Sequence, residues 1–559
     1  MAVDEFDGDV ERRGHHIRRR ARRGDGGGDR TMERRARRTG LVAAALFVAL
    51  GTVWSFATPL FAAPDEPAHA VRAAATWTGD FSGTEFRVDA GAAGSVTIKR
   101  YRVPSPYELG QPIATCNAFQ ALVPAGCGPQ FRPTGQTRQA PSTAGFYPPL
   151  FYLLVGWPAA VTDGARSVYL MRLSQVAVCA ALIGVAAWAM ARRRGSVAQL
   201  GLVLSITPMV AFLSATVNSS GLEIAAAIGL WCTLLALLDP PGRPGERRWG
   251  EATAVVVTGL FLCFSRTFSP GYAAVICGIA LLCVPGLGVR SILRRRDVVV
   301  PLVVLGVGAA LATLLITASG QFDTPATSGA QLPAGETPLS VGLGFQEASF
   351  RQMIAVFGWL DTGTAQLAYY SWIIAVGALL AGGIVLGSWR RMLGAGLALA
   401  ATVTLPIAAN WGQAETAGFV WQGRYSLPFA VGIPILAAVA WDEARKLGAA
   451  ERRRAVIGLG VLAALGQVYS LYWALRRTGV GVAGELAFFG DARWSPPFLG
   501  NIGALLAMVA VAVVTVCLLA RAPVIVGGGS RAADPGDAAP GAGVATMPAI
   551  SERAEGVTR

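Results

Sequence analysis

Apolar runs of about twenty residues recur along almost the whole chain, and they constrain its fold more than any other feature. One helical crossing of a bilayer takes about 20 apolar residues. Charged residues make up only 15% of the 559 residues, whereas soluble globular proteins carry about 25%. The chain therefore lacks the polar surface to cover several water-facing domains, and we predict an all-α, polytopic transmembrane protein. Twelve crossings are expected, near 39–61, 167–191, 197–216, 221–238, 251–265, 271–288, 298–318, 365–387, 392–410, 426–443, 455–473 and 498–520.

Three shorter apolar segments complicate this count. Segment 147–162 (YPPLFYLLVGWPAAVT) is short and begins with Tyr-Pro-Pro. Counting it as a crossing would invert every later loop, so we predict a helix that enters from the outer side and returns. The runs 251–265 and 271–288 are separated by SRTFSP, and the two would also fit one broken element.

The distribution of basic residues predicts the orientation. Lys and Arg number 48 against 34 Asp and Glu. This excess could indicate nucleic acid, but much of it falls in an N-terminal tail and in short clusters between apolar runs. With the N-terminus inside, the clusters within 192–194, 243–248, 290–296, 390–391 and 445–454 all occupy inner loops, as in positive-inside membrane proteins. We predict a multi-pass protein of the cell membrane with both termini cytoplasmic and no nucleic-acid partner.

The chain divides into three parts. Residues 1–38 are too charged and Gly-rich to pack a core, so we predict a disordered, basic cytoplasmic tail. Residues 39–520 are the transmembrane domain, and residues 521–559 are a low-complexity cytoplasmic tail, also expected to be disordered. The domain has two extracytoplasmic loops of some length, 62–146 and 319–364, and short inner loops. Function concentrates in such loops, so any chemistry is expected on the outer face.

Two of the eight cysteines stand outside the apolar runs. Cys116 and Cys127 bracket the polar segment CNAFQALVPAGC in the first outer loop. Disulfides form in oxidising compartments such as the outside of the cell. We expect a disulfide here if the loop is outside; the alternative is two incidental loop cysteines.

The motif PDEPAHAVR follows the first predicted crossing and gathers several ionisable residues. Pro67 suits the first turn of a helix, and on that helix Asp65, His69 and Arg72 share one face. Asp65 and Glu66 beside the only histidine outside the N-terminal tail predict a general base or a divalent-metal site. The alternative is structural, with the two acids capping the helix and pairing with Arg72.

Two arginines suggest a second part of this site. Arg266 interrupts apolar sequence, where a charge is costly unless it faces a cavity or a partner. Arg424 lies at the outer end of the crossing at 426–443, and guanidinium groups suit the phosphate of a lipid carrier. Glu223, an acid within an apolar helix, is a further candidate for the same cavity.

Aromatic and acidic residues of the outer segments complete the predicted substrate contacts. Tyr147 and Tyr425 could stack on sugar rings, although interfacial aromatics usually serve as membrane anchors. Asp361 in FGWLDT is a further candidate. The chain has no P-loop, dinucleotide fingerprint, paired CxxC, HExxH or GxSxG elbow with suitable partners. These absences disfavour an ATPase, a zinc protease and a serine hydrolase.

Four motifs in order carry a family resemblance. They are PDEPAH after the first crossing, YPPLFY at 147–152, FGWLDT at 357–362 and QGRYSLP at 422–428. Together they resemble the predicted membrane proteins known as domain of unknown function 2142, over about residues 45–520. One departure is NSSGLE at 218–223, where the family leads us to expect an Asp and Glu223 stands nearby.

That family is similar in layout to the GT-C glycosyltransferases, which use polyprenyl-phosphate sugars. The resemblance implies a membrane glycosyltransferase acting on an envelope glycan acceptor at the outer face. Asp65, helped by Glu66 or through bound Mg²⁺ or Mn²⁺, would deprotonate the acceptor, and Arg424 and Arg266 would stabilise the leaving phosphate. His69 would orient Asp65 or bind the acceptor.

Two alternatives to an enzyme remain open. A transporter or flippase of lipid-linked sugars would use the same cavity, and it predicts internal repeats with broken helices in corresponding positions. No convincing repeat relates the two halves of the sequence. A scaffold for envelope assembly predicts that Asp65 and Glu66 tolerate substitution.

Overall fold

The computed structural model describes residues 7–89, 95–193, 197–239, 247–284, 291–292, 294–320, 335–411, 420–444 and 446–521, with side chains from residue 30 onward. Several predictions lie outside these residues. They are the first six residues of the N-terminal tail, residues 522–559 of the C-terminal tail, residues 321–334 of the second outer loop, and Arg194, Arg243, Arg290 and Arg445 of the inner clusters.

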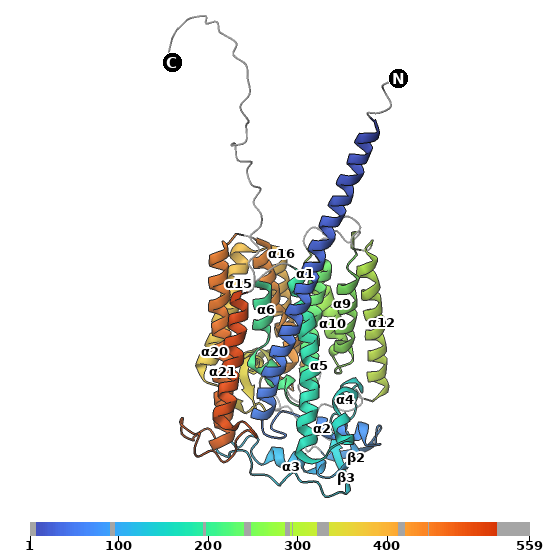
Figure 1. Cartoon of the computed structure of the whole chain (residues 1–559). Helices are drawn as coiled ribbons and strands as arrows, with labels where there is room; N and C mark the ends of the chain where they lie inside the picture. The colour runs from blue at the N-terminus through green and yellow to red at the C-terminus, as the bar shows by residue number, and fades with distance from the viewer. Residues whose placement is uncertain are drawn as a thin grey trace, which may run out of the picture. The chain divides into compact units, whose positions relative to one another are not determined.

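Long apolar helices dominate the described part of the chain, which is a multi-pass membrane protein. Nine of its helical segments are long and apolar enough to cross a bilayer. They are Arg30–Ala57 within α1 (Asp7–Ala57), α5 (Gly164–Arg192), α8 (Ser219–Leu238), α12 (Arg296–Ala318), α15 (Gln366–Leu386), α16 (Trp389–Trp411), Gly423–Ala444 made of α18 (Gly423–Ala430) and α19 (Gly432–Ala444), α20 (Ala449–Val480) and α21 (Gly500–Arg521). Figure 1 shows them side by side.

The expected count of twelve crossings is not confirmed. The run at 197–216 folds as α6 (Val197–Ser205) and α7 (Pro208–Ser214), bent by 64°. Pro208 has no N–H to continue a helix, and Thr207 caps α7 by accepting a bond from the Val210 backbone. The two other short runs form α9 (Trp249–Cys263) and α10 (Ser269–Leu282), which are shorter apolar helices. With the bent pair counted once, up to ten spans are present in the described residues.

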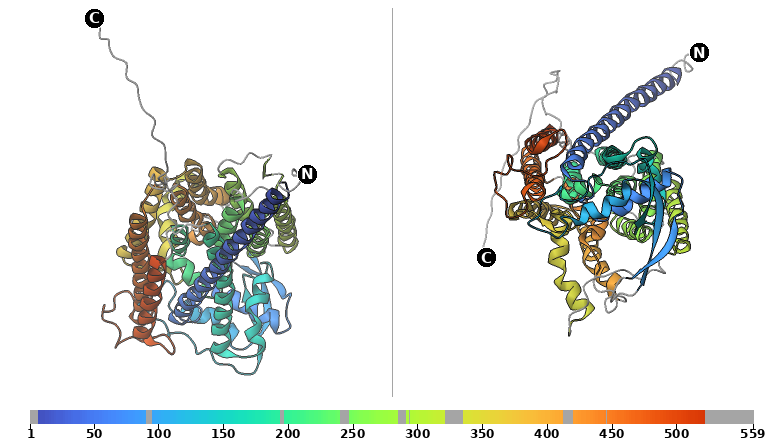
Figure 2. Two further views of the ribbon diagram at one scale, coloured as in Figure 1. Left: turned by 45° about the horizontal axis from the view of Figure 1, so that its top comes forward. Right: turned by 90° about the horizontal axis from the view of Figure 1, so that it is seen from below.

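The N-terminal helix begins earlier than the sequence suggests. Helix α1 starts at Asp7, within the segment expected to be a disordered tail. From Arg30 onward its side chains are described, and Glu33 accepts a bond from Arg37 at 2.6 Å and pairs with Arg192 of α5. These contacts tie the polar start of the apolar stretch to the bundle. Figure 2 shows α1 crossing the other helices obliquely.

The basic clusters gather at one end of the bundle, which we call the basic end. Ion pairs link them: Arg192 to Glu251, Arg193 to Asp239 and Glu443, Arg391 to Glu443, Arg452 to Asp442 and Arg247 to Asp297. These residues come from the ends of α5, α8 and α19 and from the starts of α9, α12, α16 and α20. The grouping agrees with the expected inner loops.

The opposite end carries the first outer loop, which forms a small α/β layer (Figure 1). Strands β1 (Thr84–Asp89), β2 (Ser95–Pro104) and β3 (Thr137–Ser142) form an antiparallel sheet in the order β1-β2-β3. Helix α2 (Glu66–Trp77) packs against β2 and β3. No pattern in the sequence predicted these strands.

Short helices complete this layer. They are α3 (Gly110–Thr115), 3₁₀ segments at Tyr107–Leu109 and Trp157–Ala160, and α4 (Leu150–Val155). Segment 147–162, expected to enter the membrane and return, is built from α4 and the second 3₁₀ segment, which both contact α2. Cys116 and Cys127 form a disulfide, the pairing anticipated for an outer loop.

The second outer loop, where described, contains α13 (Pro338–Gly344), α14 (Gln346–Ala355) and the two-residue strands β4 (Val356–Phe357) and β5 (Thr362–Gly363), which pair. Helix α14 contacts α7 and α18.

Helix α8 forms the centre of the core. Every residue in its apolar window is buried, and α5, α7, α9, α10 and α18 pack around it. Its N-terminus is capped by Asn218, whose side chain accepts a bond from Ser220 and donates to the Pro64 carbonyl. The start of α8 is thereby joined to the loop before α2, where the predicted site lies.

Candidate functional site

Asp65 stands at the junction between the last turn of α1 and the first turn of α2. Its backbone is left-handed (φ 60°), a conformation that Asp tolerates better than most residues. Its side chain makes no capping bond. The carboxylate is instead turned toward Arg424, whose Nη2 donates to Oδ2, and 42% of the side chain stays exposed.

Arg424, in the first turn of α18, is only partly satisfied by its neighbours. Its side chain is 1% exposed, and besides the bond to Asp65 it donates to the Tyr425 hydroxyl at 3.1 Å. Its Nε and Nη1 are buried and have no hydrogen-bond partner among the described residues. A buried donor of a charged group that lacks an acceptor costs free energy. The geometry of Arg424 therefore suits the binding of an anionic ligand.

Arg266 reaches the same cluster from the loop between α9 and α10. Its guanidinium donates to Ser220 Oγ at 2.9 Å and to the Tyr147 hydroxyl at 3.2 Å. It lies over the Tyr147 ring at 5.4 Å and over the Tyr425 ring at 4.6 Å. Glu223 Oε2 is 3.7 Å from its Nη1, and its Nε has no partner among the described residues.

Tyr425 connects the two arginines. The Arg424 guanidinium lies 5.1 Å from the centre of the same ring that Arg266 covers. Two cations on one ring repel each other, and the arrangement is favourable only with negative charge close by. Asp65, Arg266 and Arg424, expected from the sequence to converge, therefore do lie in one cluster with Tyr147 and Tyr425.

The two arginines also set the charge state of Asp65. Burial raises the pKa of this carboxyl, but the positive charges of Arg424 and Arg266 outweigh the burial, and the net pKa is lowered. The carboxylate is consequently ionised at neutral pH. One of its oxygens is held by Arg424, and the exposed part of the side chain is open to a substrate.

His69 is one turn along α2 from Asp65 and is enclosed by aromatic rings. Its Nδ1 is 2.9 Å from the Tyr152 hydroxyl, and the rings of Tyr147, Phe151 and Tyr152 surround it. Burial lowers the pKa of His69 to about 3, with Asp65 opposing this and the arginines adding to it. The imidazole is neutral at physiological pH and is packed among these rings inside the protein. A catalytic role for His69 stays a prediction.

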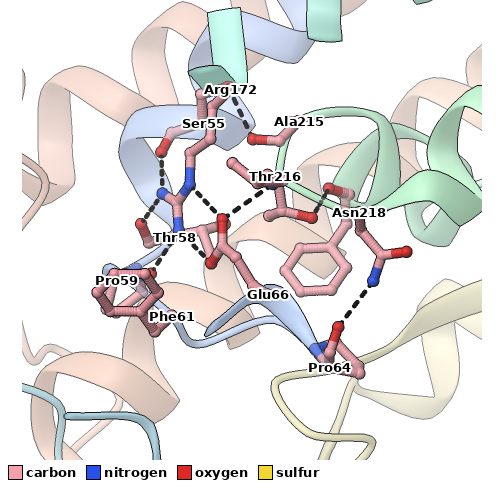
Figure 3. A network of polar contacts seen from close by, with 12 residues as sticks. Ser55, Thr58, Pro59, Phe61, Pro64, Glu66, Arg172, Ala215, Thr216 and Asn218 are labelled. Carbon is pink, nitrogen blue, oxygen red and sulfur yellow. Dashed lines mark hydrogen bonds and ion pairs between the residues drawn. The ribbon is translucent and has the colours of Figure 1, made fainter. Parts of the chain in front are cut away.

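Glu66 is not part of the cluster, which corrects its assignment as a catalytic and metal-binding residue. Its two carboxylate oxygens accept bonds from Arg172 Nε and Nη2, both at 2.7 Å, and Oε1 also accepts from the Val217 backbone (Figure 3). Both side chains are fully buried. The two adjacent acids therefore have different partners: Glu66 belongs to a buried ion pair with Arg172, and Asp65 belongs to the partly exposed cluster.

Arg172 completes this buried network. Its Nη1 donates to the carbonyls of Ser55 and Thr58, and its Nη2 donates to that of Pro59. An arginine has five N–H donors, and here each has an acceptor (Figure 3). The network fixes the end of α1 against α5 and α8. Arg172 was missed in the sequence, although a charge inside an apolar helix is the same signal that singled out Arg266.

The geometry does not fit the expected Mg²⁺ or Mn²⁺ ion. With Glu66 engaged elsewhere, Asp65 is the one carboxylate left of the predicted metal pair, and it faces two guanidinium groups. Among the described residues no group of three or more His, Cys, Asp or Glu is placed to hold a metal. A divalent cation prefers several oxygen ligands, whereas the carboxylates of Asp65 and Glu223 are each paired with an arginine.

Arg72 and Asp361, two further candidates for substrate contact, lie outside the cluster of Asp65, Arg266 and Arg424. Arg72 is buried against the sheet, where it donates to the Phe81 carbonyl at 2.6 Å and to the Tyr101 hydroxyl. Asp361 accepts a bond from the Phe119 backbone at 2.7 Å and lies 3.6 Å from Arg477. Both side chains hold the outer loops in place.

Two solved structures are similar to this chain, both crystal structures of ArnT from Cupriavidus metallidurans. The one bound to undecaprenyl phosphate shares 15% identity with a TM-score of 0.42, covering 87% of this chain and 77% of that chain. The apo structure shares 14% identity with a TM-score of 0.41, covering 86% and 76%. No curated protein sequence matches the chain.

A match to a protein-family model shows the family of this chain. The model described as predicted membrane protein (DUF2142) matches residues 47–433, more than two thirds of the chain. The chain belongs to this family. The DUF2142 region begins within α1 and ends within α19, so Asp65, Arg266 and Arg424 all lie inside it, whereas α20 and α21 follow it.

Proposed function

We propose that this protein is a glycosyltransferase that takes a sugar from a polyprenyl-phosphate donor at the outer face of the cell membrane and transfers it to an envelope glycan. The observation that carries the proposal is the pairing of an ionised, partly exposed carboxylate with the buried Arg424 and the largely buried Arg266, which both have buried donors without partners among the described residues. A base next to an anion-binding pair is what transfer from a phosphate-linked donor requires.

In this mechanism Arg424 and Arg266 bind the phosphate oxygens of the donor. Arg424 Nε and Nη1 and Arg266 Nε are the donors that lack partners in the described structure. The bond from the anomeric carbon to the phosphate oxygen breaks, and polyprenyl phosphate leaves with the electron pair. Its increasing negative charge is stabilised by the two cations in a site of low dielectric.

Asp65 acts as the base. It accepts the proton of the acceptor hydroxyl while that oxygen forms the new bond to the anomeric carbon. In the free protein Arg424 keeps the Asp65 pKa low, which makes the carboxylate a weak base. A bound phosphate competes for Arg424, which raises the Asp65 pKa. Donor binding thus makes Asp65 a stronger base.

The position of the cluster suits a donor carried by a lipid. Arg424 lies in the first turn of a span candidate, and Arg266 lies between two short apolar helices, at the end of the bundle away from the basic end. A phosphate at the membrane surface can meet both while its isoprenoid chain stays in the bilayer. The donor supplies the free energy, which agrees with the lack of nucleotide-binding motifs in the sequence. We place the basic end in the cytoplasm by the positive-inside rule.

A transporter of lipid-linked sugars is less well supported. Such folds break helices in corresponding positions of two repeats. Across the described ranges one broken pair is found, α6 with α7, and a partially exposed carboxylate beside the phosphate site has no purpose in simple translocation.

The test is Asp65→Asn in the native host, with envelope glycans profiled by mass spectrometry. We expect the product glycan to fall by about 100-fold or more, because a positioned base contributes about 10²–10⁴ to the rate. Asp163→Asn is the matched control, since Asp163 is an exposed acid at the same end whose side chain makes no capping bond. Unchanged glycans with a stably inserted Asp65→Asn protein would refute the proposal.

A further inference from the structure

A groove of about 880 Å³ runs between α1, α6, α20 and α21. It is separate from the candidate site, because neither Asp65, Arg266 nor Arg424 lines it. Figure 1 shows α6 between α1 and the pair formed by α20 and α21. The volume lies within the range of about 300–1,000 Å³ that ligand pockets occupy.

Two features leave room for the groove: helix α6 is short, and α20 carries small residues where it faces the groove. Helix α6 stops at the break before α7, where the Ile206 carbonyl accepts a bond from Gln467 of α20, and both residues line the groove. Along α20 the wall is made of Gly460, Ala463 and Ala464. Atoms that line an empty apolar space lack contacts on one side and lose dispersion energy, so an apolar ligand in that space is favourable.

One face of α1 changes from basic to apolar along the groove. Arg35 and Arg38 line the groove near the basic end of the bundle, and Val42, Leu46 and Leu50 continue the same face deeper into the bundle. These positions recur every three or four residues, the spacing of one helical face. A headgroup-sized charged end that leads into an apolar channel matches the two parts of a lipid.

The charge at this end is basic and unbalanced. Arg521, the last residue of α21, lines the groove together with Arg35 and Arg38, and no Asp or Glu is among its lining residues. Within the described residues these three arginines form no ion pair, whereas the neighbouring Arg37 pairs with Glu33. A cluster of arginines at a membrane boundary attracts anionic lipid headgroups.

We infer that the groove binds one anionic phospholipid of the bilayer. Its phosphate lies among Arg35, Arg38 and Arg521, and an acyl chain lies along Val42, Leu46 and Leu50. The bound lipid adds to the direct contact between α1 and α21, the first and last described helices. This site is independent of the proposed glycosyl transfer, and most of its walls lie outside the DUF2142 match.

The first experiment compares retained lipids by native mass spectrometry. The purified full chain is offered phosphatidylglycerol or phosphatidylcholine in equal amounts. We expect one phosphatidylglycerol to be retained at least about 10-fold more than phosphatidylcholine, and Arg35→Gln, Arg38→Gln and Arg521→Gln together to abolish that preference. The control removes three exposed arginines at the same end, Arg34→Gln, Arg294→Gln and Arg296→Gln, which do not line the groove. Equal retention of both lipids by the wild type, or equal loss in the control, would overturn the inference.

A second pair of variants tests the apolar channel. Ala512 of α21 lines the groove, whereas Ala510 of the same helix is exposed and does not. Ala512→Phe should reduce phosphatidylglycerol retention at least about 5-fold, and Ala510→Phe should leave it unchanged. Full retention by Ala512→Phe would place the lipid elsewhere. Displacement of the retained phosphatidylglycerol by added polyprenyl phosphate, as opposed to retention of both lipids at two separate sites, would overturn the assigned occupant.

Discussion

Two adjacent acids at the start of α2 pair with two different arginines and have opposite environments. Glu66 and Arg172 are fully buried, and each polar atom of their side chains is satisfied. Asp65 is 42% exposed, and its partner Arg424 keeps two buried donors unpaired. A completed ion pair in a core is structural, whereas an incomplete one at a surface is available to a ligand. We therefore expect the first pair to determine stability and the second to determine activity.

The largest expected effect is on the folding of Glu66→Gln. Removing one partner of a buried ion pair costs about 3–5 kcal/mol, because Arg172 would retain its charge in the core. Thermal unfolding of the detergent-purified protein, together with the yield of monodisperse protein, measures this. Glu66→Leu combined with Arg172→Met removes both charges but leaves the carbonyls of Ser55, Thr58 and Pro59 without their donor, so it should recover only part of the loss. A Glu66→Gln protein as stable as the wild type would show that the buried network is not structural.

The next effect is on phosphate binding by Arg424→Gln. A hydrogen bond to a charged group contributes about 1.5–3 kcal/mol, or roughly 10- to 150-fold in affinity. Undecaprenyl phosphate is the probe, and its retention by the purified protein is measured by native mass spectrometry. Arg351→Gln is the control, because Arg351 is an exposed residue paired within its own helix to Glu347. Equal retention of undecaprenyl phosphate by the two variants would show that Arg424 does not contact the phosphate.

A smaller effect concerns the pH dependence of transfer. Arg424 lowers the Asp65 pKa and burial lowers that of His69 to about 3. Both groups therefore stay deprotonated as the pH falls through the usual histidine range near about 6.5. In the free enzyme the rate should stay flat there and decline only when the pH falls below the ordinary Asp range, where Asp65 takes up its proton. An acidic limb centred near the usual histidine pKa, absent from His69→Gln, would show that His69 titrates during catalysis.

The smallest effect is expected for His69→Phe. Phenylalanine keeps the packing with Tyr147, Phe151 and Tyr152 and loses one hydrogen bond to Tyr152. Such a bond contributes about 0.5–1.5 kcal/mol, so product glycan should stay within about 10-fold of the wild type. A fall in product glycan as large as that of Asp65→Asn would show that His69 takes part in the reaction itself.

Sequence patterns predict the membrane helices well and the cluster in part. Apolar length locates spans such as α5, α8 and α12, because a bilayer crossing dictates composition. The cost of a charge at membrane depth identifies Arg266, which does reach the same cluster as Asp65 and Arg424. The sheet in the first outer loop has no such signal, since short strands in a polar loop carry little periodicity.

The roles of Glu66, Arg72 and Asp361 could not be predicted because each depends on a distant partner. Asp65 has a left-handed backbone just before α2, whereas Glu66 is the first residue of that helix, so the two side chains diverge. The partner of Glu66 lies 106 positions further along. Asp361 is engaged by Phe119, 242 positions away. A sequence motif names the residue types present but not the direction in which each side chain points.

The most direct test measures thermal stability and product glycan together for Asp65→Asn and Glu66→Gln. We expect Asp65→Asn to remain folded, with a thermal transition close to that of the wild type, and to lose at least about 100-fold of its product. Glu66→Gln should lose stability, and any fraction that stays folded should retain activity. If Asp65→Asn is folded and fully active, or if folded Glu66→Gln is as inactive as Asp65→Asn, the division between a structural pair and a functional pair is wrong.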